Sequence, residues 1–98
     1  MSPEQIAFLN QRHLPFRLTA RQTGWLLGFT IYDITVLTSR RFLKPMGKPA
    51  PNSTKYFATA QIVALQNEVR WMDRATAMLN QHWREKNGGR GKPAEDQP

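Results

Sequence analysis

A chain of 98 residues is long enough for one small domain with tails, and its hydrophobic content of 40% supports a compact core without a large substrate cavity. The absence of cysteine excludes a disulfide framework and a thiolate metal site. The first residues show no signal-peptide pattern, and no run approaches the roughly twenty apolar residues that a membrane-spanning helix needs. We therefore expect a soluble, cytoplasmic protein.

The positive charge is concentrated in the first half of the chain. The net charge is +7, and eight cations lie between Arg12 and Lys55, with Asp33 as the only acid among them. The segment from Glu68 to Arg74 is neutral. A basic surface of this kind is expected to meet phosphates, and the alternative is that it only aids solubility. Nucleic acid or another polyanion is therefore the predicted partner.

The first expected element is a short helix in the N-terminal segment 1–17. Ser2 can cap it, and Pro3 suits the first helical position. The helix should end by His13, before a short connector. Its apolar stripe comprises Ile6, Phe8 and Leu9.

The next expected helix begins after Thr19 and runs to about Leu27. Thr19 and Gln22 have the spacing of a capping box. Gly24 lies in the middle of this helix, where glycine costs about 1 kcal/mol relative to alanine, so we expect the following helix to cross closely there. Gly28 then ends the helix at a turn that needs a positive φ.

A second helix of this pair is expected to follow at once. Thr30 caps it, Asp33 in its first turn complements the helix dipole, and it ends near Arg40 or Arg41. Its expected buried face comprises Ile31, Ile34 and Leu37. Gly28 follows Gly24 by four residues, and the β-branched Ile34 follows Gly28 by six. These offsets suit two helices held near a right angle. A helix-turn-helix is therefore predicted, and an ordinary helical hairpin is the alternative.

From Phe42 to Phe57 the periodicity changes. Three prolines exclude a helix, and Leu43–Met46 and Lys55–Phe57 are expected to form two short strands. Residues 47–53 between them have turn chemistry. The segment therefore predicts a β-hairpin of about fifteen residues with a basic tip.

A single long helix is expected over residues 59–87. Apolar side chains recur along it at alternating spacings of three and four, which predicts one narrow apolar seam. The seam comprises Ile62, Leu65, Val69, Met72, Thr76, Leu79 and Trp83. The glycine-, lysine- and proline-rich residues 88–98 are expected to be a disordered tail.

Several of these features together resemble the winged helix-turn-helix family that includes phage excisionases and the N-terminal domains of MerR-type regulators. The matching residues are 18–30 (LTARQTGWLLGFT), Ile34, Leu37, 42–45 (FLKP) and 55–57 (KYF). The resemblance covers just under half of the chain and assigns residues 18–58 to a helix-turn-helix plus wing. It implies a mostly α fold with three short helices, a small β-hairpin wing and a long C-terminal helix.

Two positions depart from the family pattern. Val36 stands where members often carry a basic residue, and Arg41 stands where a glycine usually ends the second helix. The turn at Arg41 is therefore expected to be altered or strained.

The resemblance implies that the second helix docks in the major groove of double-stranded DNA and the wing contacts the backbone. The expected base contacts are Tyr32, Thr35, Val36 and Ser39. The expected phosphate contacts are Arg17, Arg21, Arg40, Arg41, Lys44, Lys48 and Lys55. For each cation a solvated surface charge is the alternative. The residues expected in the core rather than in a ligand site are Trp25, Leu26, Leu27, Phe29 and Phe57.

Two classes of function fit these residues. The first is a small DNA-binding transcriptional regulator or an excisionase-like architectural factor. The second is an adaptor for protein interaction or dimerisation that keeps the fold without specific DNA binding, which Asp33, Val36 and the seam through Trp83 favour. RNA binding is less favoured, because the wing lacks exposed aromatic pairs for stacking.

The long helix carries the one expected protein interface. A homodimer could form through Met72, Thr76, Leu79 and Trp83. Alternatively, the helix folds back on the first helix and buries Trp71 and Met72 against Ile6 and Leu9. His13 and His82 stand alone, so neither a metal site nor a catalytic pair is predicted. No cofactor, small-molecule ligand, membrane association or enzymatic activity is expected.

Overall fold

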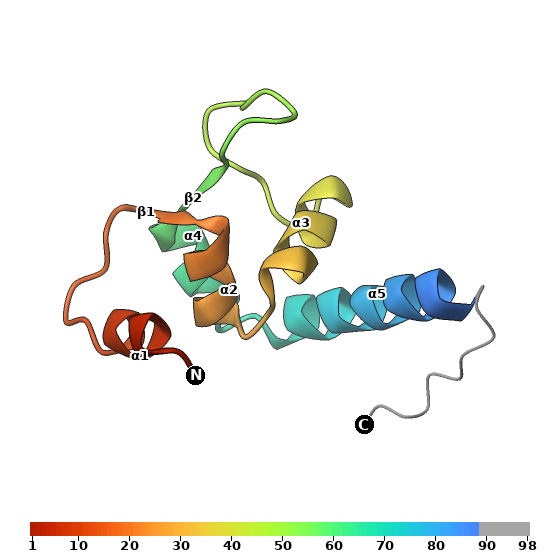
Figure 1. Ribbon diagram of the computed structural model, residues 1–98, viewed down its shortest axis with the longest axis horizontal. Coiled ribbons are helices and arrows are strands. Elements are labelled where there is room, and N and C mark those ends of the chain that lie inside the picture. Colours follow the sequence, from red (N-terminus) through yellow and green to blue (C-terminus); the bar gives the residue numbers. More distant parts are fainter. Residues whose placement is uncertain (89–98) are drawn as a thin grey trace.

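A computed structural model describes residues 1–88 of the chain (Figure 1). The elements in chain order are α1 (Pro3–Leu9), β1 (Arg17–Thr19), α2 (Ala20–Leu27), α3 (Ile31–Ser39), β2 (Tyr56–Ala58), α4 (Thr59–Leu65) and α5 (Val69–Gly88). This part of the chain is thus mostly helical, with five helices and a two-stranded antiparallel sheet. The tail predicted over 88–98 lies outside the described residues, apart from Gly88, which ends α5. None of the five helices has the length and apolar character needed to cross a membrane.

The two short helices α2 and α3 begin as predicted, each with a complete capping box. Thr19 Oγ1 accepts from the Gln22 amide at 3.1 Å, and Gln22 Oε1 accepts from the Thr19 amide at 3.0 Å. Thr30 and Asp33 form the same reciprocal pair at 3.0 and 3.1 Å. These bonds satisfy amides that the first turn of a helix leaves without partners.

The turn between α2 and α3 depends on the two predicted glycines. A Cβ on Gly24 would overlap the main-chain oxygen of Phe29 and would lie 3.5 Å from Cγ1 of Ile34. Gly28 has a φ of 85°, and its amide donates to the Gly24 oxygen at 2.7 Å. The expectation that α3 crosses α2 closely at Gly24 is therefore confirmed.

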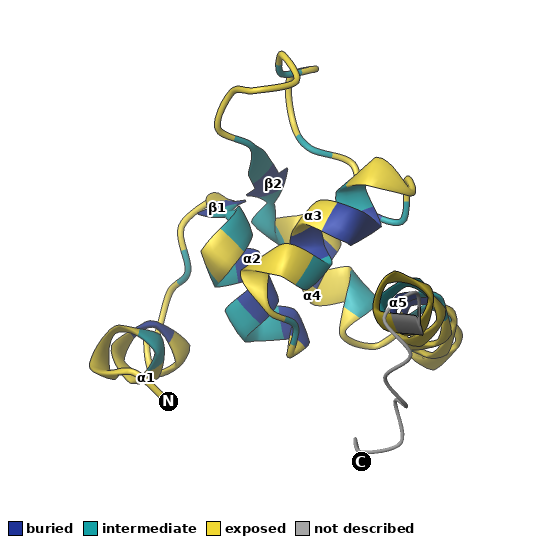
Figure 2. Ribbon diagram, turned by 45° about the vertical axis from the view of Figure 1, so that its right-hand side comes forward, coloured by how far each residue is buried: buried dark blue, intermediate teal, exposed yellow. Residues whose placement is uncertain are grey.

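The core lies where the helix pair, the sheet and the last helix meet (Figure 2). Its fully buried members include Leu18 of β1, Phe57 of β2, and Ile34 and Leu37 of α3. Of the predicted core residues, Leu27 and Phe57 are buried, and the others pack against the core while half-buried: Trp25, Leu26 and Phe29. Ile31, predicted to be buried, is exposed on α3.

The predicted hairpin is wrong in its strand pairing. The strand at Tyr56–Ala58 pairs with Arg17–Thr19, in the register Leu18↔Phe57, and Leu43–Met46 is not a strand. Pro45 has no amide to donate to a ladder, and a single backbone bond, from the Met46 amide to the Tyr56 oxygen at 2.8 Å, closes the loop. We refer to residues 42–55 as the wing loop. It is a loop on a sheet rather than a β-hairpin.

The predicted single long helix is also wrong, because it is divided into α4 and α5 at residues 66–68. The division lets α4 pack on α2 while α5 turns to pack on α3. The Gln66 side chain donates to the Leu26 oxygen at 2.8 Å and holds the corner against α2. Val69, a predicted seam residue, consequently starts α5 with 78% of its surface exposed.

Helix α5 is attached to α3 through a seam and two indoles. Ala75 and Leu79 are buried, and Thr76, the predicted seam residue, is exposed. Trp71 Nε1 donates at 3.3 Å to the main-chain oxygen of Phe42, which lies just after the end of α3. Trp83 Nε1 donates at 2.9 Å to Oδ1 of Asp33, which lies near the start of α3. The α5 helix therefore supports both ends of α3.

This packing bears on both expectations for the last helix. Leu79 is buried within the chain and Met72 and Trp83 pack against its core, whereas Thr76 is exposed, so most of the predicted dimer seam packs within the chain and homodimerisation stays a prediction. The fold-back onto the first helix is wrong, because α5 contacts α3 instead. The first helix ends at Leu9, earlier than predicted, and its stripe contributes one buried residue, Phe8, which packs on Trp25 with ring centroids 5.5 Å apart.

We expect Gly24→Ala to destabilise the protein. Alanine would gain about 1 kcal/mol of helix propensity, but its Cβ would overlap a main-chain oxygen that cannot rotate away, so the net loss should be about 1–3 kcal/mol. Urea unfolding measures it. In the control Gly28→Ala the added Cβ meets nothing within 4 Å, and only the positive φ opposes it, at about 1 kcal/mol. A Gly24→Ala protein as stable as the wild type would contradict the close crossing.

We expect Trp83→Phe to lower the free energy of unfolding by about 1–2 kcal/mol, because it removes the donor to a carboxylate oxygen. Trp71→Phe, which removes the longer bond to a neutral carbonyl, should cost less. A double-mutant cycle of Trp83→Phe with Asp33→Asn isolates the coupling between the two side chains. Additive losses in this cycle would show that the bond contributes nothing.

Candidate nucleic-acid interface

Helix α3 presents one polar stripe to solvent. Tyr32, with 70% of its surface exposed, Thr35 and Ser39 lie at helical spacings of three and four and are all exposed, as predicted. Thr35 Oγ1 donates to the Ile31 oxygen at 3.1 Å, and Ser39 Oγ donates to the Val36 oxygen at 2.9 Å. Because both hydroxyl protons are directed to the helix, the lone pairs remain for donors such as the amino groups of adenine and cytosine.

Val36 is not part of this stripe. Its exposed fraction is 9%, and it belongs to the core cluster. Asp33 and Arg40 lie about one turn on either side of it, and they contact Trp83 and His82 of α5. Helix α5 therefore covers this flank of α3, and the prediction of a base contact at Val36 is wrong.

Asp33 has a structural role on α3. Its Oδ2 accepts from the Thr30 amide, and its Oδ1 accepts from the indole of Trp83. Asp33 is the only acid between Arg12 and Lys55. The single carboxylate of this basic stretch is therefore engaged in hydrogen bonds at the start of α3.

The end of α3 carries two exposed arginines. Arg40 Nη2 lies 3.5 Å from Nδ1 of His82. Arg41 has a φ of 65°, the left-handed conformation in which a helix commonly terminates on glycine. The following amide, that of Phe42, donates to the Leu37 oxygen at 2.8 Å and closes the helix. The altered turn expected at Arg41 is therefore confirmed.

The wing loop presents two further exposed cations, Lys44 and Lys48. Gly47 and Lys48 have φ angles of 74° and 48°, so two successive left-handed residues turn the chain just after Met46. The bond from the Met46 amide to Tyr56 fixes the base of the loop beside this turn.

Lys55 differs from the other cations of the loop. It is half-buried, and its Nζ donates to the Pro51 oxygen at 2.9 Å and to the Ser53 oxygen at 3.3 Å. Its ammonium group therefore closes the loop, and it retains one proton for a phosphate.

Two more predicted phosphate contacts come from β1 and from the first turn of α2. Arg17 of β1 is exposed and places its guanidinium carbon 3.9 Å from the centre of the Tyr56 ring. This stacking gives Tyr56 a packing role and holds Arg17 on the sheet. Arg21 is exposed in the first turn of α2.

The segments that carry these cations lie on one side of the molecule. Helix α2 starts beside the sheet and runs away from the wing loop, whereas α3 returns and ends beside that loop (Figure 1). The same arrangement is visible after rotation (Figure 2). We call the exposed cations that these segments carry the basic face: Arg17, Arg21, Arg40, Arg41, Lys44 and Lys48.

Two features of the structure have no signal in the sequence pattern. Phe16, part of the predicted connector, is 96% exposed, and Trp83 bonds to a residue fifty positions earlier in the chain. Neither periodicity nor spacing indicates an exposed aromatic residue or an indole donor at these positions.

Comparison of the chain with protein-family models, curated proteins and solved structures finds no match. Within residues 1–88, no group of three or more histidine, aspartate or glutamate side chains is placed to hold a metal ion. The arrangement of exposed cations and of the α3 stripe is therefore the basis for a proposal about function.

We expect Arg41→Gly to raise the free energy of unfolding by about 0.5–1 kcal/mol, because glycine relieves the left-handed strain while gaining some entropy in the unfolded chain. The matched control is Arg40→Gly. It removes the same charge at a φ of −92°, where glycine relieves nothing. Thermal unfolding of both variants checks this. Equal shifts for the two would mean that charge, and not backbone strain, determines the effect.

Proposed function

We propose that this chain is a small DNA-binding protein of the winged helix-turn-helix type, similar to excisionases and MerR-type regulators. Helix α3 docks in the major groove of double-stranded DNA, and the wing loop contacts the sugar–phosphate backbone. The role is that of a transcriptional regulator or an architectural factor.

The observation that carries this proposal is the position of the basic face. Its six cations come from β1, α2, the end of α3 and the wing loop, which are separated in the sequence and gathered on one side by the fold. Clustered cations of this kind release the counterions that surround a duplex, which is the main source of affinity for phosphate backbones. The only acid within this stretch of sequence is engaged by Thr30 and Trp83.

The α3 stripe supports docking in a groove. Gly24 and Gly28 allow α3 to cross α2 closely, and Tyr32, Thr35 and Ser39 on α3 are exposed to solvent. None of these side chains offers the two-pronged contact of arginine with guanine, so each base contact is modest. Affinity in this proposal therefore comes mainly from the basic face, and specificity comes from several weak contacts.

The three features that favoured an adaptor have roles within the chain. Asp33 caps α3 and accepts from Trp83, Val36 is buried, and the seam of α5 packs on the chain's own core. These three features are therefore engaged within the chain and do not themselves point to a partner. The DNA-binding proposal is therefore preferred.

Fluorescence anisotropy with a labelled 30-base-pair duplex at several salt concentrations tests the proposal. The wild type should bind at low salt, and the logarithm of its affinity should fall with the logarithm of salt concentration with a slope of about −5, as expected for six phosphate contacts. Arg40→Ala with Arg41→Ala should reduce the magnitude of that slope by about 2, because two contacts are lost.

The matched control is Arg70→Ala with Arg74→Ala, which removes the same charge from exposed positions of α5, outside the basic face. This variant should keep the wild-type slope. Equal losses in the two double variants would show that net charge alone drives binding. Absence of binding by the wild type at low salt would overturn the proposal.

A further inference from the structure

Phe16 is an aromatic side chain almost entirely in solvent. It is 96% exposed, the highest value among the large hydrophobic residues of the described part of the chain. Burial of a phenylalanine is strongly favourable, so a nearly free ring on a basic molecule is a candidate contact for a partner.

The ring is carried on a fixed backbone. The Thr59 amide donates to the Phe16 oxygen at 2.9 Å, and the Thr59 hydroxyl donates to the preceding carbonyl, that of Pro15. Arg17, the next residue, is held in β1 and by its stacking on Tyr56. Both sides of Phe16 are therefore restrained, and little backbone entropy is lost when its ring is buried by a partner.

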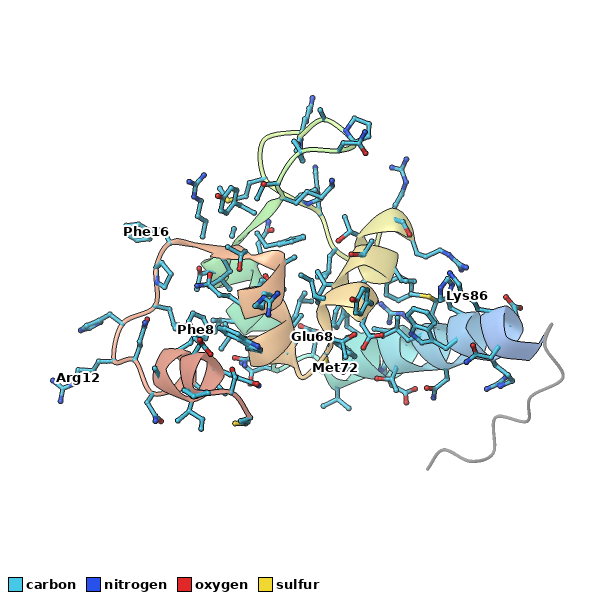
Figure 3. The ribbon with its side chains drawn as sticks, viewed as in Figure 1. Phe8, Arg12, Phe16, Glu68, Met72 and Lys86 are labelled. Atoms are coloured by element: carbon cyan, nitrogen blue, oxygen red, sulfur yellow. The ribbon has the colours of Figure 1, made fainter. Side chains whose placement is uncertain are left out.

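The surroundings of the ring are cationic. Arg12 and Arg17 are exposed on either side of it in the sequence, and no acid occurs between Glu4 and Asp33. Figure 3 shows Phe16 and Arg12 projecting outward from the same connector, away from the body of the molecule. Charge therefore favours an anionic partner.

The shape of the site selects the class of partner. Phe16 stands on a projecting connector rather than in a groove or pocket, whereas the side chains of a recognised peptide are usually held in grooves and pockets. A projecting apolar side chain instead suits a partner that opens a gap for it. Apolar side chains of this kind enter the gap between two base pairs of a bent duplex.

We propose that Phe16 is a wedge that inserts between base pairs, with Arg12 and Arg17 on the flanking phosphates. This inference rests on the proposed DNA-binding function and adds a contact at the other end of β1 from the wing loop. The molecule is 45 Å long, which corresponds to about thirteen base pairs, so one duplex can reach both regions.

A wedge has a signature that phosphate contacts lack. Insertion requires unstacking of a base step, and unstacking is easiest where a base pair is already mismatched. The wild type should therefore bind a duplex with one central mismatch about tenfold more tightly than the fully paired duplex of the same length. Phosphate contacts respond equally to both duplexes, because the backbone charge is the same.

The experiment compares the wild type, Phe16→Ala, Phe16→Trp and Val69→Ala on the two duplexes, each labelled at its ends for energy transfer. The affinity of Phe16→Ala for the paired duplex should be within about twofold of the wild-type affinity. This variant should no longer prefer the mismatched duplex and should no longer bend the DNA. Phe16→Trp should keep both. Val69→Ala, which alters another exposed apolar residue, should behave as the wild type.

The remaining outcomes overturn the inference in distinguishable ways. If the wild type binds both duplexes with equal affinity and Phe16→Ala does the same, the wedge is contradicted and the DNA-binding proposal stands. No binding to either duplex at low salt removes both. Analytical ultracentrifugation tests for self-association. If the wild type self-associates and Phe16→Ala does not, the ring belongs to a contact between protein copies and the wedge is contradicted.

Discussion

The close crossing of α2 and α3 at Gly24 is the constraint on which the rest of the structure depends. With no side chain at this position, the main chain of Phe29 can pass directly over α2, and Ile34 can pack back onto it. The crossing directs α3 back toward the wing loop. The crossing thus brings the start of α2 and the end of α3, the two segments of the helix pair that carry exposed cations, to the same side of the molecule.

The second support of α3 comes from α5. One indole bonds at the start of α3 and the other just after its end, so α3 is held along the flank that adjoins its exposed stripe. Asp33 links the cap of α3 to α5, because one carboxylate oxygen accepts from the Thr30 amide and the other accepts from the Trp83 indole. The only acid between Arg12 and Lys55 is in this way used to hold α3 in place.

Features set by neighbouring residues could be predicted from the sequence. The capping boxes, the turn at Gly28 and the unusual end of α3 at Arg41 depend on contacts within a few positions. Features set by distant contacts could not. The partner of β2 is determined by the burial of Leu18, and Val36 is covered by a helix whose direction follows from the corner at residues 66–68. The exposed stripe of α3 was predicted except at the one position that α5 covers.

The pairing of β1 with β2 has a consequence for the order in which the molecule is assembled. In the sequence, α2, α3 and the wing loop all lie between the two strands. The strands therefore cannot pair until the ribosome has released residue 58. The helix pair can form earlier from local contacts, whereas the sheet must close a long loop, which is the slower event. During synthesis, α3 can therefore form before the sheet that orients it is closed.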